Sequence, residues 1–486
     1  MRSITVNVRT HTNHAAAVDR FRELGTLAIL SPMESAGGTI SGVVTEAVKA
    51  LNAEEITDLC LRHTLYDWAA QAGLKPLPVV GAQGVYFHTA DGRRFIDFNS
   101  QLMCVNAGHG DRRIIEAIQR QAEQLPYISP FMAHESRARL GRKLAELMPG
   151  DIDKVFFTLA GADANENAIK IARAVTGRSK ILARYRSYHG STGNALQATG
   201  DPRRWPNENP GGGVVHVLDP YHGIQRGWDT VEESLSNLEE TIQLEGPQTI
   251  AAFMLEPIVG TNGILIPPDG YLQGVRELCD RHGILMICDE VMTGFGRTGR
   301  WFAVDHWAVV PDMITMAKGL TSSYVPLGAV GMRPKVAAFF NEHVFYGGLT
   351  YNSHPLGCAA ALGAIQAYEE DDMVGNAQRM GAVLARYHNQ LRDRHPCVGA
   401  TRSIGLFGCI ELVRDRQTLE PLAPFNGTSP EMKAIAQALL DAGLHTFVRW
   451  NTIMTNPPLC ITEAQLDEGF EILDGALEIG DRAVRD

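Results

Sequence analysis

Two apolar runs between residues 284 and 320 constrain the fold of this 486-residue chain more than any other feature. The first run spans residues 284–288 and the second spans residues 313–317. Apolar runs of this length are typical of strands that are buried on both faces of a parallel sheet. The pattern therefore predicts an α/β fold with an open, mostly parallel sheet.

Each run ends on a side chain that can take part in chemistry. Asp289 and Glu290 follow the first run, and Lys318 follows the second. Because open α/β sheets place ligands at the carboxyl ends of their strands, we expect a carboxylate and an amine in one crevice. The pair suits pyridoxal phosphate, which a lysine holds as a Schiff base while an aspartate keeps the pyridine nitrogen protonated. A lysine at a strand end is also common as a solvated terminus, so the pair alone leaves both interpretations open.

Residues 294–299, GFGRTG, match the dinucleotide-binding pattern G-x-G-x-x-G literally. That pattern requires its glycines directly between a strand and a helix. Here residues 289–293 intervene after the predicted strand, and residues 301–304 begin no helix. An NAD-dependent oxidoreductase is therefore the disfavoured alternative.

Composition narrows the function classes further. A net charge of −11 argues against nucleic acid as a partner, and the longest apolar runs are too short to span a membrane. The eight cysteines form no C-x-x-C pair, which indicates reduced thiols and neither a zinc site nor a disulfide framework. We expect a cytoplasmic protein of two domains with no metal, nucleic acid or membrane partner.

Residues 1–50 fit no other part of the chain. They carry Arg2 and Arg9 before the first acid, Asp19, as some transit peptides do, but no apolar core of a secretory signal. We interpret them as an N-terminal extension without an assigned role.

Several local patterns predict individual elements. Asn52 to Glu55 form a capped helix start, and residues 84–98 form a hairpin with a turn at Asp91 and Gly92. A further helix is predicted from residue 431 to 441, with Gly443 after its end.

Residues 154–176 are typical of a short buried strand followed by a helix. Small residues at the turn allow the free N–H groups of Gly161 and Ala162 to approach an anion, such as a cofactor phosphate.

Three segments, DEVMTGFGRTG from Asp289, PDMITMAKGL from Pro311 and GGLTYNSHP from Gly347, resemble the class III aminotransferases. This pyridoxal-phosphate-dependent family includes taurine and ω-amino acid aminotransferases, and the resemblance extends from about Leu51 to the C-terminus. It implies fold type I, with a large doubly wound domain over residues 101–357 and a smaller α+β domain. The smaller domain would be built from residues 51–100 and 358–486.

The resemblance also assigns roles to single residues. Lys318 would anchor pyridoxal 5'-phosphate and transfer protons, and Asp289 would bind its ring nitrogen. Tyr188 and Val291 would cover the two faces of the ring, although without the resemblance Tyr188 is more typical of an aromatic that caps the core. His189 and the strand-end acid Glu256 would complete the pocket, and Thr350 would reach the phosphate of a neighbouring subunit, which implies a homodimer with shared sites.

The family usually carries serines at the positions of Ala160 and Ala162. Backbone donors remain at Gly161 and Ala162, but a hydroxyl contact to the phosphate is lost. We expect weaker cofactor binding than in relatives.

The substrate pocket is predicted with less detail. Leu102 and Met103 would face the amine, with plain core residues as the alternative. Arg449 would bind a substrate carboxylate or sulfonate, with a structural arginine as the alternative. Relatives place a glutamate at the position of Thr261 to pair such an arginine, so here the arginine is expected to swing away instead of pairing locally.

The resulting hypothesis is a transaminase. It would move an amino group from an amine or an ω-amino acid of the taurine or β-alanine kind to a keto acid such as pyruvate or 2-oxoglutarate. Aminomutases and racemases of the same fold keep the same motifs and remain open alternatives.

Overall fold

The structure is a computed structural model that describes residues 50–484, except for residues 210, 212 and 221–229. The chain divides into two units, Met1–Leu51 and Asn52–Asp486, and all elements described below belong to the second. Apart from Ala50, the predicted N-terminal extension lies outside the described residues.

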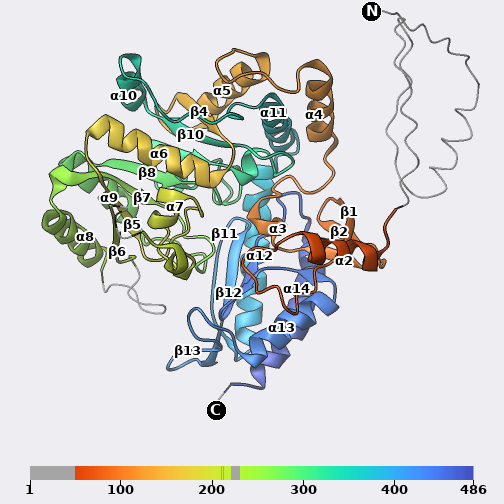
Figure 1. Ribbon diagram of the computed structural model, residues 1–486. Helices are drawn as coiled ribbons and strands as arrows, with labels where there is room; N and C mark the ends of the chain where they lie inside the picture. Colours follow the sequence, from red (N-terminus) through yellow and green to blue (C-terminus); the bar gives the residue numbers. More distant parts are fainter. Residues whose placement is uncertain (1–49, 210, 212, 221–229, 485–486) are drawn as a thin grey trace, which may run out of the picture. The chain divides into compact units, whose positions relative to one another are not determined.

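A seven-stranded sheet forms the centre of the large domain (Figure 1). Its strands β5, β6, β7, β8 and β9 pair in parallel, and β10 runs antiparallel to both of its neighbours, β4 and β9. The predicted parallel sheet is therefore confirmed. In spatial order the strands are β4 (Lys154–Thr158), β10 (Gly328–Met332), β9 (Met313–Met316), β8 (Leu285–Asp289), β7 (Ile250–Leu255), β5 (Lys180–Arg184) and β6 (Val214–Val217).

Helices cover both faces of this sheet. Successive residues of one strand point to opposite faces, so a single strand contributes side chains to the core on each side. Met286 and Cys288 of β8 belong to one hydrophobic cluster, which they share with α8 and α9, whereas Ile287 belongs to a second cluster with α6. Every residue of β7 is buried, as expected for a strand covered on both faces. The helices that accompany the sheet are α6 (Gly161–Thr176), α7 (Gly193–Ala198), α8 (Val231–Glu245), α9 (Tyr271–His282) and α10 (Pro334–Ala337).

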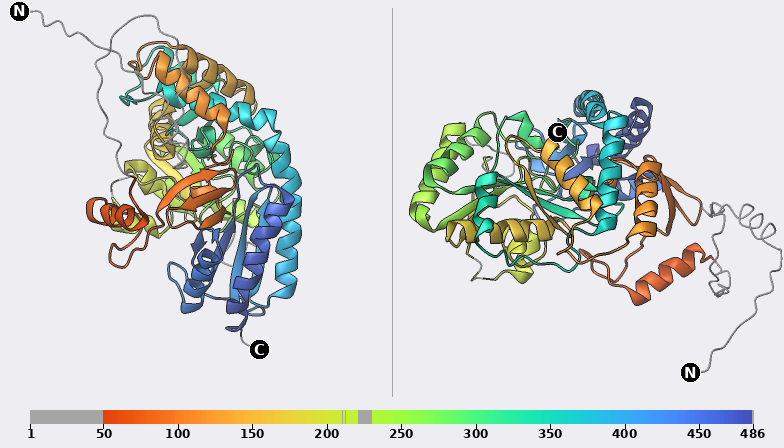
Figure 2. Two further views of the ribbon diagram at one scale, coloured as in Figure 1. Left: turned by 90° about the vertical axis from the view of Figure 1, so that its right-hand side faces the viewer. Right: turned by 90° about the horizontal axis from the view of Figure 1, so that it is seen from above.

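A four-stranded sheet joins residues from both ends of the described chain. The predicted hairpin is confirmed: β2 (Tyr86–Thr89) pairs antiparallel with β3 (Arg94–Asp97), and Gly92 takes a φ of 86° in the turn. The other side of β2 pairs with β1 (Val79–Gln83). The other side of β3 pairs in parallel with β14 (Leu444–His445), so the orange hairpin lies beside the blue C-terminal segment (Figure 2).

The third sheet is formed entirely by the C-terminal part of the chain. Its order is β11 (Val398–Ile404), β12 (Phe407–Asp415), β16 (Thr452–Thr455) and β15 (Val448–Arg449), and β13 (Glu420–Pro421) pairs with β12. Gly443, with a φ of 83°, follows the predicted helix α13 as expected. Three helices belong to this region: α12 (Met373–Arg394), α13 (Pro430–Asp441) and α14 (Glu463–Asp481).

The remaining helices connect these sheets. A capping box between Asn52 and Glu55 starts α2 (Ala53–His63), as predicted. The predicted domain boundary at residue 357 falls inside α11 (Pro355–Glu370), which packs against α4 and α5, and the domain limits stay a prediction. The other connecting helices are α3 (Ser100–Met103), α4 (Arg112–Gln124), α5 (Glu135–Leu147) and the 3-10 turns η1 (Pro202–Asn207), η2 (Pro247–Thr249), η3 (Ala303–His306), η4 (Lys318–Leu320) and η5 (Ala338–Asn341).

Candidate active site

The two strand ends predicted to meet are direct neighbours. β8 and β9 are parallel, and Asp289 at the end of β8 lies opposite Thr315 of β9. Lys318 follows β9 by two residues and opens η4. The sheet thus brings a carboxylate and an amine to one edge.

A cavity of about 360 Å³ lies at this edge. It is lined by residues from five chain segments that follow β4, β5, β7, β8 and β9. Of the residues predicted for the cofactor, it brings together Gly161, Ala162, Tyr188, His189, Glu256, Asp289, Val291 and Lys318.

Three hydrogen-bond donors hold the carboxylate of Asp289, which lines the cavity. Its Oδ2 atom accepts hydrogen bonds from Asn165 Nδ2 and His189 Nδ1, both at 2.7 Å, and its Oδ1 atom accepts from the backbone N–H of Val291 at 3.0 Å. Asn165 is itself fixed, because its Oδ1 atom accepts from the hydroxyl of Thr315 at 2.7 Å. This buried network holds the carboxylate in one fixed orientation.

Lys318 is half-buried beside these acids. Burial is the largest influence and lowers the pKa of its amine, while Asp289 and Glu256 act in the opposite direction. A lysine with a lowered pKa carries the neutral, nucleophilic amine at a lower pH than a surface lysine does. Its φ of 47° is rare for a non-glycine residue, and such strained positions concentrate at functional sites.

The β4–α6 turn is shaped for close approach to a ligand. The N-cap residue Ala160 makes no side-chain hydrogen bond to the first turn of α6, so its own side chain leaves the N–H groups there open to a ligand. A Cβ atom on Gly161 would lie 2.9 Å from Val291, and one on Gly190 would lie 2.6 Å from the Cβ of Ala162. Both positions therefore need glycine for the turn to pack this closely.

Glu256 acts on the backbone around Tyr188. Its Oε1 atom accepts from the Tyr188 N–H at 3.0 Å and its Oε2 atom from the Gly260 N–H at 2.7 Å, and burial raises its pKa. The ring of Tyr188 contacts the guanidinium of Arg203, whose Cζ atom lies 3.6 Å from the ring centroid. Glu256 thus fixes the segment that presents this ring to the cavity.

Four predicted site residues are not among those that line this cavity. Met103 is 2% exposed and belongs to the main hydrophobic cluster, as the core alternative describes, whereas Leu102 is 50% exposed. Thr350 is exposed, and its carbonyl oxygen accepts from the hydroxyl of Tyr127. Contacts of Leu102, Met103 and Thr350 with a ligand stay predictions.

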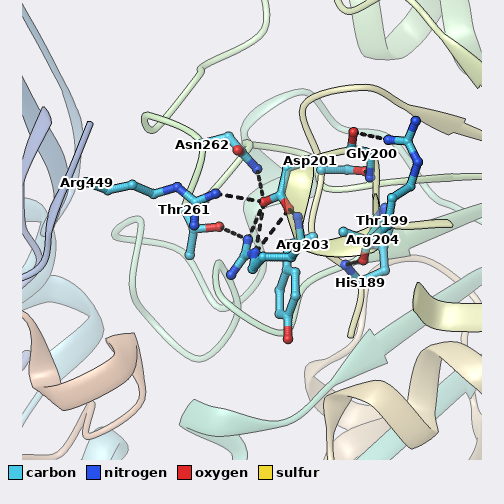
Figure 3. Close-up of polar contacts among 12 residues, drawn as sticks. His189, Thr199, Gly200, Asp201, Arg203, Arg204, Thr261, Asn262 and Arg449 are labelled. Carbon is cyan, nitrogen blue, oxygen red and sulfur yellow. Dashed lines mark hydrogen bonds and ion pairs between the residues drawn. The ribbon is translucent and has the colours of Figure 1, made fainter. Parts of the chain in front are cut away.

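The fourth residue is Arg449, and here the expectation that it swings away, which was based on Thr261, is wrong. Its Nη2 atom lies 3.2 Å from Asp201 Oδ2, so the arginine pairs locally and does not swing away (Figure 3). Thr261 instead accepts a hydrogen bond from Arg203 at 2.8 Å. The local carboxylate comes from a different segment than in the relatives that carry a glutamate at position 261.

Sequence reasoning missed Asn165, Thr315, Asp201 and Arg203. Asn165 was visible as a polar residue one turn into the helix after the anion-binding turn. Arg203 was visible in the segment Asp201-Pro202-Arg203-Arg204, whose charges stand close to the aromatic Tyr188 in sequence. Their partners lie up to 248 residues away, and no local pattern reveals such pairs.

Comparison with known proteins decides the family. The sequence model of the family described as "Aminotransferase class-III" matches residues 69–477. The chain belongs to the class III aminotransferases. Like them, it is a pyridoxal-phosphate-dependent transaminase of fold type I, which moves an amino group from an amine donor to a keto acid.

Individual class III aminotransferases resemble the chain over most of its length. The taurine:2-oxoglutarate aminotransferase of Bifidobacterium kashiwanohense, solved with pyridoxal phosphate and glutamate, is 42% identical with a TM-score of 0.86, covering 89% of this chain and 99% of its own. An (S)-enantioselective ω-transaminase of Thermomicrobium roseum is 37% identical with a TM-score of 0.83, covering 88% and 99%. The aminotransferase YhxA of Bacillus subtilis is 37% identical, covering 79% of this chain and 88% of its own.

The cavity fits the cofactor of class III aminotransferases. The buried carboxylate of Asp289 suits a protonated ring nitrogen, the uncapped start of α6 suits a phosphate, and Lys318 has the lowered pKa of an amine that bonds to an aldehyde. The His189 Nε2 atom is buried without a hydrogen-bond partner in the described part of the chain, which leaves a polar atom next to this space.

The structure gives less support for a dinucleotide site, a metal site, a disulfide framework or a membrane span in this class III aminotransferase. The GFGRTG segment joins no strand directly to a helix, since β8 ends at Asp289 and only η3 follows. Among residues 50–484, outside the gaps noted above, no group of histidines, cysteines and acids is placed to hold a metal ion. All eight cysteines are free thiols, and no described helix is long and apolar enough to cross a bilayer.

Proposed function

We propose that Lys318 and Asp289 carry the catalysis of this class III aminotransferase. The single observation behind this assignment is their position at the ends of adjacent parallel strands, in one cavity. Bound pyridoxal phosphate supplies an electron sink for the bond that breaks at the amino donor. The Nζ atom of Lys318 would remove the proton from the donor carbon as a general base and would then return a proton as a general acid.

The other residues of the cavity hold the cofactor. The N–H groups of Gly161 and Ala162 would bind its phosphate, and Tyr188 and Val291, which line the same cavity, would hold its ring. Asp289 holds the ring nitrogen protonated, which makes the ring a better acceptor of electrons. His189 donates to Asp289 and so keeps the carboxylate oriented, and Glu256 keeps Tyr188 in place.

The amino donor is an amine that carries a second, anionic group, such as β-alanine or taurine, and the acceptor is pyruvate or 2-oxoglutarate. Arg449 binds the carboxylate or sulfonate, because a guanidinium presents paired donors to such groups. Leu102 and Met103 form the apolar wall near the amine. The likeness to the taurine:2-oxoglutarate aminotransferase supports this substrate class.

The enzyme works as a cytoplasmic homodimer with shared sites. Thr350 is exposed on its own chain, and its hydroxyl serves the phosphate of the partner subunit. Reduced cysteines agree with a cytoplasmic setting.

The visible absorption spectrum of the purified protein tests this function. After addition of pyridoxal phosphate, we expect a visible band that bleaches with β-alanine or taurine and returns with pyruvate or 2-oxoglutarate. A band that never bleaches with any amine would overturn the proposal. Bleaching and recovery without consumption of a keto acid would indicate an aminomutase or a racemase instead.

A further inference from the structure

The turn after β9, which carries Lys318, is bonded to Tyr368 of helix α11. The Tyr368 hydroxyl donates a hydrogen bond of 2.6 Å to the carbonyl oxygen of Gly319, which lies 49 residues earlier in the chain. Tyr368 is 1% exposed, and burial raises its pKa, so the hydroxyl keeps its proton and remains a donor. Tyr368 is not among the residues that line the cavity, so it reaches the site through this turn.

The backbone of this turn is strained. Lys318, Ser322 and Ser323 take φ values of 47°, 50° and 60°, in the left-handed region that residues other than glycine rarely adopt. Such conformations persist only where the surrounding structure holds them. The Ser322 hydroxyl accepts from the N–H of Ala107 at 2.9 Å and so fixes the far end of the turn. The end that carries Lys318 depends on other contacts.

Distant segments confine Gly319, the residue after the lysine. A Cβ atom on Gly319 would lie 2.5 Å from the Nδ2 atom of Asn106 and 2.9 Å from the Cβ atom of Phe295, so the backbone packs directly against these side chains. Within the turn, the carbonyl oxygen of Gly319 accepts from the N–H of Ser322 at 3.2 Å. Tyr368 ties the same oxygen atom to another element, which prevents the turn from rotating as a unit.

Helix α11 gives the Tyr368 hydroxyl a firm support. Most residues of α11 are buried, and the helix packs against α4 and α5 (Figure 1). The ring of Tyr368 also meets the ring of Trp301 edge-on, with 6.2 Å between the ring centroids. The position of the hydroxyl is therefore set by contacts outside the lysine turn, and the turn adapts to it.

We propose that Tyr368 is a positioning residue for Lys318: its hydroxyl holds the Gly319 carbonyl group and so keeps the strained turn, and the amine, in place at the cavity. Because the direction of a side chain follows from its backbone dihedrals, relaxation of φ at Lys318 would turn the amine away from the cavity. The inference rests on the proposed role of Lys318 and adds to it a residue that lies outside the cavity.

The reactivity of Lys318 in the apoenzyme tests this role. 2,4,6-Trinitrobenzenesulfonate modifies neutral amines, so the rate of labelling at Lys318, measured by peptide mass spectrometry between pH 7 and pH 10.5, reports the pKa of its amine. Burial, the largest influence, lowers this pKa from 10.5. In Tyr368→Phe the amine is less buried, so we expect the midpoint of the labelling profile to rise by at least about 0.5 pH. The other groups that act on this pKa are unchanged in the variant: Cys104, Asp289, Glu256 and Arg203.

Tyr271→Phe is the matched control. Tyr271 is also 1% exposed, but it opens α9 and is not among the residues that line the cavity. Both variants keep the aromatic ring, so circular dichroism should show an intact fold in each. The control should keep the labelling profile of the unaltered protein. With the cofactor bound, kcat should fall about fivefold or more in Tyr368→Phe and stay within about twofold in the control.

The labelling separates this inference from the proposed function, because it does not depend on turnover. An unchanged profile in Tyr368→Phe would overturn the inference. An equal shift in Tyr271→Phe would overturn it too, since it would show a general loosening of the core. A shift confined to Tyr368→Phe, in an enzyme whose visible band never bleaches with any amine, would support the positioning of Lys318 and overturn only the proposed function.

Discussion

The Nδ2 atom of Asn165 lies 2.7 Å from the Oδ2 atom of Asp289, and it also donates to the carbonyl oxygen of His189. The side chain of Asn165 is in turn held by the hydroxyl of Thr315 on the next strand. One amide therefore ties helix α6 to the ends of β8 and β9. The orientation of the Asp289 carboxylate depends on this link.

We expect Asn165→Ala to lower kcat/KM about tenfold or more, because a buried carboxylate loses a charge-assisted hydrogen bond. Asn167→Ala is the matched control, since Asn167 is equally buried on α6 but, among the described residues, donates within the helix, to the carbonyl oxygen of Asp163. Steady-state kinetics and the visible spectrum measure the effect. Equal losses in the two variants would show that helix packing, and not Asp289, is responsible.

Lys318→Ala should abolish turnover and leave the fold intact, because the variant lacks the amine that anchors the cofactor and moves the proton. Lys433→Ala, on an exposed position of α13, is the control and should keep full activity. Initial rates and circular dichroism check both variants. Normal turnover by Lys318→Ala would refute the mechanism.

The two alanines at the start of α6 should respond differently to replacement by serine. Ala162→Ser restores a hydroxyl next to the predicted site of the cofactor phosphate. The dissociation constant of this variant for pyridoxal phosphate should therefore fall about threefold to tenfold. Ala160→Ser places a hydroxyl at the N-cap, where it should stabilise the apoenzyme by about 1 kcal/mol. Equilibrium dialysis and urea unfolding measure the two effects. An unchanged dissociation constant in Ala162→Ser would contradict the phosphate assignment.

Glu290 should make the stability of the apoenzyme depend on pH. Burial raises its pKa from 4.5 to about 7, although its carboxylate accepts hydrogen bonds from Thr293 and from the N–H of Val304. Because the pKa in the folded state is the higher one, this contribution to stability is complete below pH 4.5 and is lost as the pH rises through 7. The loss is on the order of 3 kcal/mol in the free energy of unfolding.

Glu290→Gln should remove this dependence, since an amide can serve both hydrogen bonds without ionising. Urea unfolding of the apoenzyme at pH 5 and pH 8.5 gives the free energy of unfolding of both proteins. Relative to the unaltered protein, the free energy of unfolding of the variant should be higher at pH 8.5 than at pH 5. Glu277→Gln, at an exposed position of α9, is the control. A constant difference between Glu290→Gln and the unaltered protein at both pH values would disprove the titration of Glu290.

Mixing two inactive variants tests the shared site. Thr350→Asp should repel the phosphate of the partner's cofactor, so this variant and Lys318→Ala should each be inactive alone. Refolding them together should restore about a quarter of the activity, because half of the dimers are mixed and each mixed dimer has one intact site. No recovery, or a fully active monomer in gel filtration, would contradict the shared site.

The sequence allowed the centre of the sheet to be predicted, because β8 and β9 coincide with mainly apolar runs whose pattern depends on local burial. The position of Lys318 and Asp289 in one cavity could be predicted for the same reason, since each follows such a run. The pairing of Arg449 with Asp201 could not be predicted, because it depends on how two distant segments pack. The surroundings of Met103 could not be predicted either, since the packing of distant segments decides whether its side chain contacts the core or a substrate.

The parallel pairing of β3 with β14 has a consequence for synthesis of the chain on the ribosome. All seven strands of the large sheet lie between residues 154 and 332, so they can leave the ribosome and pair while the C-terminal third is still being translated. The β14 side of β3 stays open until residues 444–445 emerge. A stalled or truncated product would therefore present an unpaired strand edge, where chaperones can bind and other chains can aggregate.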